Sequence, residues 1–385
     1  MVGKWAHMWE LARLFGVLGT IAFGGPAAHV AMMRTEVVTR RKWMTDQQFL
    51  DLVAATHLIP GPNSTELAIH IGHTRGGWPG LLVAGTAFIL PAALIVMLVA
   101  WVYVTYGSLP DVRAVMAGIA PVVIAIVAHG LWGMGQSAVK SVWLAVLGLG
   151  SLVAVLAGVH ELAVLGGATI LAVVVHLAST RGVVATLIGL LAGGSATSLA
   201  AQAAAVVATP FSIGTMFAMF VKTGAVLFGS GYVLLAFLRA DFVERLGWLT
   251  EGQLLDAIAV GQITPGPVFT TATFIGYVLD GPRGALLATL GIFLPAFVFV
   301  ALTAPIVPKL RSSPLMGAVL DGVTVASLGL MAAVTWQLGH AALSGWLTVT
   351  IALVSLVALL RTRLHSGWLV LVGAALGWIA LRTNF

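Results

Sequence analysis

The sequence has no cysteine, and it has few charged residues for its length of 385. Without thiols, neither a disulfide framework nor a thiolate metal site can form. Asp, Glu, Lys and Arg make up only 8% of the chain, whereas soluble proteins carry roughly 25%. Because so little charge cannot cover a water-exposed globule of this size, a soluble fold is excluded.

Enzymatic motifs are also absent from the sequence. There is no HExxH, GxSxG or Walker A pattern, so we expect neither an enzyme nor ATP-driven transport by this chain alone, and no cofactor. The net charge of +6 does not indicate a nucleic-acid partner, because the basic residues stand singly or in short clusters between apolar runs. His70 and His73 have a helical spacing, but no set of carboxylate ligands accompanies them, so we predict no metal site.

Long apolar segments fill the chain instead. Hydrophobic residues make up 59% of the sequence, and the mean hydropathy is +1.05. Strand patterns are absent, and the apolar runs approach the length of about 20 residues that a membrane-spanning helix needs. The sequence therefore predicts an all-α polytopic membrane protein with the lipid bilayer as its solvent. The apolar segments lie roughly at 11–33, 78–106, 112–135, 142–158, 161–178, 183–207, 212–238, 284–307, 315–337, 343–360 and 366–382.

Two further apolar segments, 49–73 and 254–278, are each interrupted by a Pro-Gly-Pro triplet, at Pro60-Gly61-Pro62 and at Pro265-Gly266-Pro267. Proline removes a backbone donor and clashes with the preceding turn, so each segment should form two half-helices. About ten helical residues reach about 15 Å, half the hydrocarbon core, which puts each break near the membrane midplane. The segments either cross the membrane, which gives thirteen crossings in all, or return as re-entrant hairpins, which gives eleven.

The two breaks belong to an internal repeat. The triplets stand 205 residues apart, Trp43 and Trp248 precede them at the same spacing, and further landmarks follow in the same order. Landmarks kept in order over about 120 residues indicate a duplication. Since six crossings per half plus a linking helix would turn the second half over, we expect inverted repeats. We predict an N-terminal transporter repeat at 1–180, a linking transmembrane helix at 181–210 and a C-terminal transporter repeat at 211–385.

The residues that follow the first break are polar. Asn63-Ser64-Thr65-Glu66 begins a half-helix, whose free N–H groups and positive dipole end favour an anion. Thr270 and Thr271 take the corresponding place after the second break, without a carboxylate. These side chains either only cap helix ends or line a substrate pocket, and their occurrence in both repeats favours the pocket.

The first helix of each half contains a glycine cluster, Gly24-Gly25 in the first half and Gly229-Ser230-Gly231 in the second. These glycines permit either close helix packing or unwinding at the depth of the Pro-Gly-Pro breaks. His29 follows the first cluster and is a candidate donor to an oxyanion, although a lone histidine more often satisfies a helix contact.

Lys222 lies inside the first span of the second half. A charge within a membrane span is costly and is a functional hypothesis by default. Its ammonium either supplies positive charge to an anionic substrate, pairs with Glu66, or extends to the membrane interface. If Glu66 does not pair with Lys222, it is a candidate proton carrier.

Five stretches of the sequence carry a family signature. They are Phe23-Gly24-Gly25-Pro26-Ala27-Ala28-His29, Arg40-Arg41-Lys42-Trp43-Met44, Leu58-Ile59-Pro60-Gly61-Pro62-Asn63-Ser64-Thr65-Glu66, Phe228-Gly229-Ser230-Gly231-Tyr232-Val233-Leu234-Leu235 and Thr264-Pro265-Gly266-Pro267. They resemble the chromate ion transporter family in its long, two-domain form, and the resemblance covers nearly the whole chain. It implies export of chromate across the bacterial inner membrane, which gives chromate resistance. It also implies competition or exchange with sulfate, a tetrahedral dianion of similar shape.

The residues themselves indicate an anion site at helix starts and do not select chromate among oxyanions. We expect a secondary transporter for a tetrahedral oxyanion, with a site lined by the glycine breaks, both Pro-Gly-Pro termini and Lys222. A sulfate or other oxyanion exchanger, an anion channel, and an intramembrane enzyme or receptor stay open as alternatives. The coupling ion, the orientation in the membrane and a homodimeric state are open as well.

Overall fold

Helices form all the regular structure in the part of the chain that the computed structural model describes, residues 2–22, 25–107, 109–181, 210–228, 231, 233–304, 314–362, 364 and 366–383. No strand occurs in these residues, so the all-α prediction is confirmed. The first half contains α1 (Val2–Ile21), α2 (Gly25–Arg34), η1 (Thr35–Arg40), α3 (Asp46–Thr56), α4 (Asn63–Tyr106), α5 (Pro110–Ala138), α6 (Val142–Leu156) and α7 (Glu161–Arg181). The second half contains α9 (Ile213–Val226), α10 (Leu234–Leu238), η2 (Arg239–Arg245), α11 (Glu251–Ile263), η3 (Val268–Thr270), α12 (Thr271–Thr303), α14 (Pro314–Ala342), α15 (Trp346–Arg361) and α16 (Ser366–Thr383).

Five of the described helices are long and apolar enough to cross a membrane. They are α4 and α12, which follow the Pro-Gly-Pro triplets, and α5, α7 and α14. The helices α6, α9, α15 and α16 are shorter but also apolar. The chain is therefore a multi-pass membrane protein. The segment expected at 183–207, and with it most of the linking helix at 181–210, lies outside the described residues.

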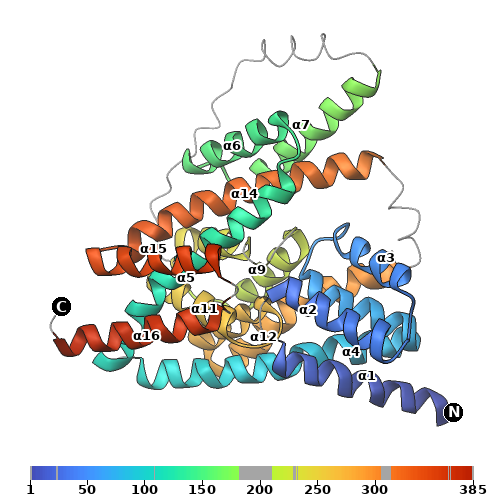
Figure 1. Cartoon of the computed structure of the whole chain (residues 1–385), viewed down its shortest axis with the longest axis horizontal. Helices are drawn as coiled ribbons and strands as arrows, with labels where there is room; N and C mark the ends of the chain where they lie inside the picture. Colours follow the sequence, from blue (N-terminus) through green and yellow to red (C-terminus); the bar gives the residue numbers. More distant parts are fainter. Residues whose placement is uncertain are drawn as a thin grey trace.

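The first apolar stretch forms two helices that fold back on each other, α1 and α2 (Figure 1). Gly25 begins α2 with a φ of +75°, a conformation that glycine adopts without steric cost. A cavity of about 670 Å³ separates the two arms, with walls from residues 13–21 of α1 and residues 31–41 of α2 and η1. Such distant residues can line one cavity only if the arms run antiparallel. The expectation that 11–33 crosses the membrane once is therefore wrong, because the chain reverses between α1 and α2.

The first helices of the second half repeat this hairpin. Helix α9 ends at Val226 and α10 begins at Leu234, and α10 with η2 returns beside α9. The rings of Phe220 in α9 and Phe242 in η2 lie 4.8 Å apart, and the Lys222 ammonium lies 2.6 Å from Asp241. The expected span at 212–238 is thus also a hairpin and not a single crossing.

The first Pro-Gly-Pro segment is a helical hairpin formed by α3 and the start of α4. Helix α3 begins at a capping box of Thr45 and Gln48 and ends at Thr56, before the break. Trp43 precedes α3, yet the guanidinium of Arg75, which lies beyond the break, is 5.0 Å from its ring centroid. The second arm therefore returns to the level at which the first arm starts.

The second Pro-Gly-Pro segment is built in the same way by α11 and the start of α12. Tyr103 of α4 donates a hydrogen bond to Asp256 in α11 at 2.7 Å, and its ring centroid lies 5.0 Å from that of Phe274 in α12. Asp256 and Phe274 lie equally far before and after Pro265, so the two arms are antiparallel. Both triplets therefore lie at the turns of helical hairpins.

A tight reversal inside α4 and another inside α12 join each hairpin to a long helix. Gly77 and Gly281 have φ values of +64° and +58°, in the region that favours glycine. On the two sides of the first reversal, Gly72 and Gly80 bring their backbones into contact, and the corresponding glycines of α12 do the same. Four of the expected segments, 11–33, 49–73, 212–238 and 254–278, are hairpins in the described part of the chain. Fewer than eleven segments are therefore left to cross the membrane.

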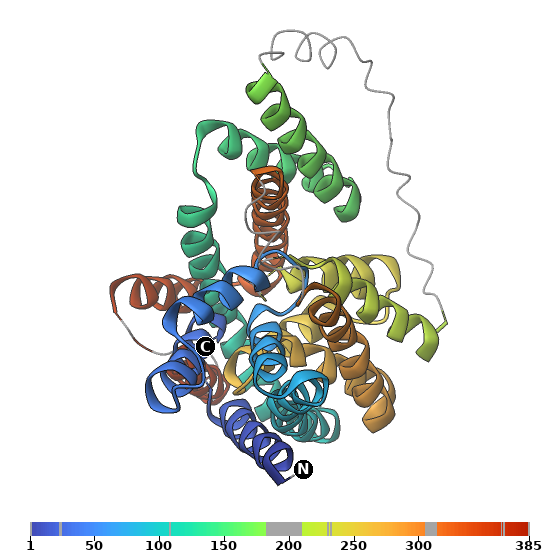
Figure 2. The same ribbon diagram turned by 90° about the vertical axis from the view of Figure 1, so that its right-hand side faces the viewer.

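The remaining helices of each half pack against the other half. Helix α5 lies along α15 and α16, while α14 lies along α6 and α7 (Figure 1, Figure 2). A Cβ at Gly118 of α5 would meet the backbones of Gly373 and Gly377 in α16, so only glycine permits this approach. Gly322 of α14 faces Ala172 of α7 in the same way. The two halves are therefore interleaved, and each helps to cover the other.

Candidate functional site

Four chain breaks meet where the hairpins of the two halves turn. The N–H of Gly61 donates to the carbonyl of Leu227 at 2.7 Å, and the N–H of Gly266 donates to the carbonyl of Ala22 at 2.9 Å. Gly61 and Gly266 stand 205 residues apart, and so do Ala22 and Leu227. Each Pro-Gly-Pro triplet is therefore fastened to the glycine break of the opposite half.

The two central glycines have different surroundings. Both have a positive φ, +138° at Gly61 and +87° at Gly266. A Cβ at Gly266 would lie 2.5 Å from the Cβ of Ala92 in the packed wall of α4. A Cβ at Gly61 would instead meet the carboxylate of Glu66. The first break thus has a polar side chain against it where the second break has a rigid helix.

Buried polar side chains follow the first break. Ser64, Thr65, Glu66 and His70 are at most 4% exposed. They lie on the first turns of α4, where the leading N–H groups of a helix have no intrahelical acceptor. The atoms here that have no hydrogen-bond partner among the described residues are Asn63 Oδ1, Thr65 Oγ1, both carboxylate oxygens of Glu66, and His70 Nε2. Since buried polar groups are nearly always bonded in native structures, this end of α4 has the unsatisfied groups of a polar binding site.

The hydroxyl groups around the second break are already satisfied. Thr264, Thr270 and Thr271 each donate to a backbone carbonyl of their own turn, at 2.7 to 2.8 Å. Thr273 bonds to Thr289 across the reversal of α12 at 2.7 Å. Within residues 264–273, all of which the structure describes, no buried polar side-chain atom lacks a partner. The two threonines singled out from the sequence, Thr270 and Thr271, therefore have their hydroxyl hydrogens engaged by the protein.

Two histidines border the first-half breaks. The Nε2 of His29 in α2 bonds to the carbonyl of Ala22 at 3.0 Å, while its Nδ1 has no partner in the described part of the chain. The Nδ1 of His57 lies 3.2 Å from the amide nitrogen of Asn63. The carbonyl of Ala22 also accepts the N–H of Gly266, so His29 is attached directly to the junction between the halves.

A polar cavity of about 230 Å³ adjoins the first break. Its walls include His57 from the break, Phe228 from the opposite glycine break, and Lys140 and Asp321. The ammonium of Lys140 at the end of α5 lies 2.7 Å from the carboxylate of Asp321 in α14. This pair was not predicted, because no local pattern tells which distant charge folds against the break.

Lys222 takes part in a buried cluster of charges. Its ammonium lies 2.6 Å from Asp241 and 3.5 Å from Glu161, and Arg245 lies 3.3 Å from Asp241. Asp241 is only 1% exposed, so its charge depends on these partners. Glu66, the partner that the sequence left open for Lys222, is not a member of this cluster.

The glycine clusters fall partly outside the described residues, since Gly24, Gly229 and Ser230 are not among them. Gly25 begins α2 at the first cluster. Gly231 packs against Val268, whose Cβ would lie 3.2 Å from a Cβ added to that glycine. Helix ends therefore lie on both sides of each cluster, at Ile21 and Gly25 in the first half and at Val226 and Leu234 in the second.

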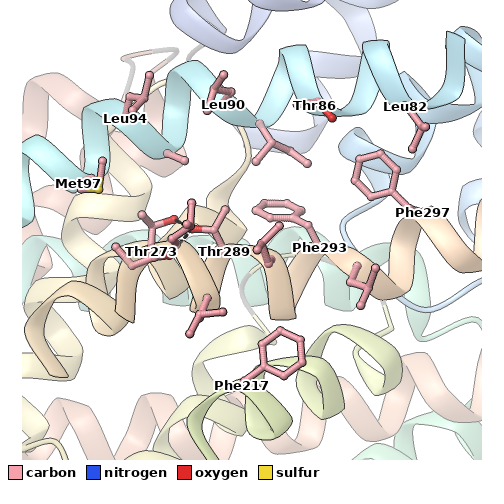
Figure 3. A pocket seen from close by; sticks show the side chains of 17 residues that line it. Leu82, Thr86, Leu90, Leu94, Met97, Phe217, Thr273, Thr289, Phe293 and Phe297 are labelled. Atoms are coloured by element: carbon pink, nitrogen blue, oxygen red, sulfur yellow. Dashed lines mark hydrogen bonds between the residues drawn. The ribbon is translucent and has the colours of Figure 1, made fainter. Parts of the chain in front are cut away.

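A second cavity, of about 620 Å³ between α4 and α12, is apolar (Figure 3). Figure 3 shows leucine and phenylalanine side chains around it, with Thr273 and Thr289 bonded to each other. Leu82, Leu90 and Leu94 on its rim are 58%, 51% and 51% exposed, as expected of side chains that face lipid. This groove contains no charged group, so the polar cavity beside the first break fits an anion better.

Known proteins resemble this chain over most of its length. The family described as Chromate transporter matches residues 9–175 and 214–378. The chromate transport protein of Cupriavidus metallidurans is 33% identical over 374 residues, which cover 95% of this chain and 91% of that protein. The chromate transport protein of Pseudomonas aeruginosa is 32% identical over 337 residues, covering 86% and 81%. The probable chromate transport protein of Synechococcus elongatus is 30% identical over 351 residues, covering 91% and 89%.

No solved structure matches the chain. The two matched regions correspond to the two halves, each with its glycine break and its Pro-Gly-Pro break. The family match and the coverage of whole relatives agree with the resemblance noted from the sequence motifs. The chain belongs to the chromate transporter family.

Proposed function

We propose that the chain is a secondary transporter, and not an enzyme, that exports chromate across the bacterial inner membrane and so confers chromate resistance. Its family and three relatives named as chromate transport proteins support a role in chromate transport. Its apolar helices support a multi-pass position in the membrane. Its sequence has no nucleotide-binding motif, which supports transport driven by gradients.

One observation carries the proposal, the set of unsatisfied buried polar groups at the first break. A tetrahedral dianion needs several donors. The Thr65 hydroxyl has no partner among the described residues. The N–H groups of Asn63 and Ser64 precede the first helical hydrogen bonds of α4, which Thr65 and Glu66 donate to the carbonyl of Pro62. We propose that the oxyanion binds here, and that the second break and the Lys222 cluster frame the site. The proposed site comprises Gly24, Gly25, His29, Pro60, Gly61, Pro62, Asn63, Ser64, Thr65, Glu66, Lys222, Gly229, Ser230, Gly231, Pro265, Gly266, Pro267, Thr270 and Thr271.

We further propose that the repeats at 1–180 and 211–385 are inverted and joined by the segment 181–210. The first-half hairpins start at the Gly77 end of α4, where Arg75 pairs with Glu10 at 3.1 Å. The second-half hairpins start near its other end, where Tyr103 contacts Asp256. Residues 78–106 of α4 span about 40 Å between these points. Inverted repeats around a central site are a common basis for alternating access.

Labelling of introduced cysteines tests the inverted arrangement, since the chain has no cysteine of its own. Gln47→Cys and Gly252→Cys form a matched pair, because both positions are exposed and stand 205 residues apart. We expect a membrane-impermeant maleimide added to intact cells to label one of them and not the other. Labelling of both from the same side contradicts the inverted repeat.

The membrane potential favours the proposed direction of transport. Moving one charge through 100 mV changes the free energy by about 2.3 kcal/mol, so export of a dianion from a negative-inside cell gains about 4.6 kcal/mol. The potential alone can therefore drive export, although it does not exclude exchange with another anion. Sulfate or a further oxyanion is the alternative substrate, and competition with chromate during uptake by inverted vesicles measures that selectivity.

Uptake of radioactive chromate into inverted vesicles also tests the site. We expect Asn63→Ala and Thr65→Val to lower uptake by tenfold or more, since a hydrogen bond to a charged group is worth about 1.5–3 kcal/mol. Thr264→Val is the matched control, because that hydroxyl bonds within α11 and is not part of the proposed site. Uptake unchanged in both first-break variants removes the proposed site, and no uptake by the unaltered protein removes the proposed function.

A further inference from the structure

Glu66 differs from the other fully buried carboxylates in the described part of the chain. Asp241 pairs with Lys222 at 2.6 Å, and Glu161 lies 3.5 Å from the same ammonium. Glu66 is 0% exposed, and neither of its oxygens has a hydrogen-bond partner among the residues that the structure describes. A buried carboxylate without partners is costly in its ionised form. Its charge therefore depends on what else occupies the space around it.

The carboxylate of Glu66 is directed at the first break. Glu66 lies on the first turn of α4, and one of its oxygens is the atom nearest to the position of a Cβ on Gly61. Gly61 in turn donates its N–H to the carbonyl of Leu227, at the glycine break of the other half. A ligand at the start of α4 therefore lies next to this carboxylate.

No described side chain compensates the charge of Glu66. His70, one turn later on α4, is the next titratable group along the helix, and its Nε2 has no partner among the described residues. None of the described titratable groups on α4 and on the helices packed against it forms a hydrogen bond or an ion pair with Glu66. These groups are His7, Glu10 and Arg13 on α1, His29 and Arg34 on α2, Asp46, Asp51 and His57 on α3 and its end, His70, His73, Arg75, Tyr103 and Tyr106 on α4, Glu251 and Asp256 on α11, and Tyr277, Asp280 and Arg283 on α12.

An ionised Glu66 and a bound dianion repel each other, because the buried space does not screen their charges as water does. A protonated Glu66 instead offers an O–H donor to an oxygen of the anion. At the corresponding place in the second half, Thr271 is bonded to the carbonyl of Val268. The two repeats therefore provide one such carboxyl group for the central site.

We propose that Glu66 takes up one proton from water when the oxyanion binds, so that transport of the anion is coupled to protons. This inference rests on the proposed oxyanion site at the first break. The step forms one O–H bond on the carboxylate and transfers no electrons. Because linkage is reciprocal, the proton tightens oxyanion binding by the factor by which the oxyanion favours protonation.

Calorimetric titration of the purified full chain with sodium sulfate measures this proton directly. Titrations at one pH in two buffers of different protonation enthalpy give the number of protons taken up per bound anion. We expect about one proton for the unaltered protein, and a dissociation constant that rises about tenfold per pH unit once free Glu66 is ionised. Glu66→Gln should bind sulfate with no proton uptake and with little dependence on pH.

Two control variants separate Glu66 from other titratable groups. Asp256→Asn removes a carboxylate that accepts a hydrogen bond from Tyr103, outside the proposed site, and should keep the uptake of about one proton. His70→Gln removes the imidazole one turn from Glu66 and should also keep it. Loss of proton uptake in His70→Gln but not in Glu66→Gln assigns the proton to the histidine and overturns the proposal.

The outcomes distinguish this inference from the proposed function. Sulfate binding without proton uptake by the unaltered protein overturns the coupling and leaves the oxyanion site intact. Proton uptake that persists in Glu66→Gln overturns it as well. If Glu66→Gln does not fold, Glu66→Asp takes its place, and binding without proton uptake by that variant counts against the proposal. If the unaltered protein binds neither sulfate nor chromate, the oxyanion site fails together with the coupling.

Discussion

The two halves of the molecule share one frame and differ in the chemistry at its centre. Each has two helical hairpins and a tight reversal, and reciprocal hydrogen bonds join their breaks. At the first break the side chains of Thr65 and Glu66 have no hydrogen-bond partner in the described part of the chain, whereas Thr270 and Thr271 at the second break bond to their own turn. The duplication thus repeats the scaffold but not the polar groups. A single substrate needs only one set of contacts, so the other half is free to become structural.

The hairpins that begin the two halves also differ in how their arms are joined. They are α1 with α2 and η1 in the first half, and α9 with α10 and η2 in the second. In the second half Lys222 joins α9 to Asp241 of η2 at 2.6 Å. At the corresponding positions the first half has Val17 and Glu36, and Glu36 pairs with Arg40 of its own turn at 2.6 Å. A cavity of about 670 Å³ separates the arms there. We therefore expect the second half to hold the site in place, and the first half to bind the oxyanion and to move during transport.

Alanine substitution at Gly61 and at Gly266 should give the largest difference in stability between the two halves. Gly266→Ala puts a Cβ 2.5 Å from that of Ala92 at a φ of +87°, so we expect a loss of about 3–5 kcal/mol in stability. Gly61→Ala meets only the movable end of Glu66, so the loss should be about 1–2 kcal/mol, while sulfate binding weakens. Thermal unfolding and calorimetry in detergent measure the two effects. Equal unfolding temperatures for the two variants contradict the division between the halves.

Removal of Lys222 should have the next largest effect. Lys222→Met leaves Asp241 buried and short of its closest partner, and we expect a loss of about 3 kcal/mol in stability. The double variant Lys222→Met with Asp241→Asn removes both charges and should recover most of that loss. Val17→Met, at the corresponding place in the first half, is the matched control and should change the unfolding temperature little, because residue 17 lines an open cavity. A double variant as unstable as Lys222→Met shows that the pair does not act as a unit.

The breaks were predictable from the sequence because proline and glycine act on their own stretch of backbone. Pro60-Gly61-Pro62 ends a helix wherever it stands, and its copy 205 residues later must do the same. Hydropathy, however, reports only that residues 11–33 are apolar, and not which way the chain runs after Gly25. The positive φ of that glycine reverses the chain, so one expected crossing became a hairpin.

The candidate site was predictable in its residue types but not in its partners. Polar residues at the start of a helix after Pro62 indicate an anion site on local grounds. Whether Thr65 and Thr271 bond to the protein depends on the exact path of each turn, which the sequence does not reveal. The pairing of Lys140 with Asp321 joins α5 to α14, and such contacts arise only because the halves are interleaved.

Arg34 and Arg239 occupy corresponding positions in the two halves, and their substitution should give the smallest of these differences in stability. Arg239 is 13% exposed and bonds to Glu251 at 2.6 Å and to Gln337 at 2.7 Å, so Arg239→Ala should cost about 2 kcal/mol. Arg34 stands 205 residues earlier and pairs with Asp46 at 2.7 Å, but both side chains are about half exposed. Because water and salt screen that pair, Arg34→Ala should leave the unfolding temperature nearly unchanged, and any difference should vanish at high salt. If Arg34→Ala destabilises the protein as much as Arg239→Ala, the first hairpin is held as firmly as the second, and it is not the mobile half.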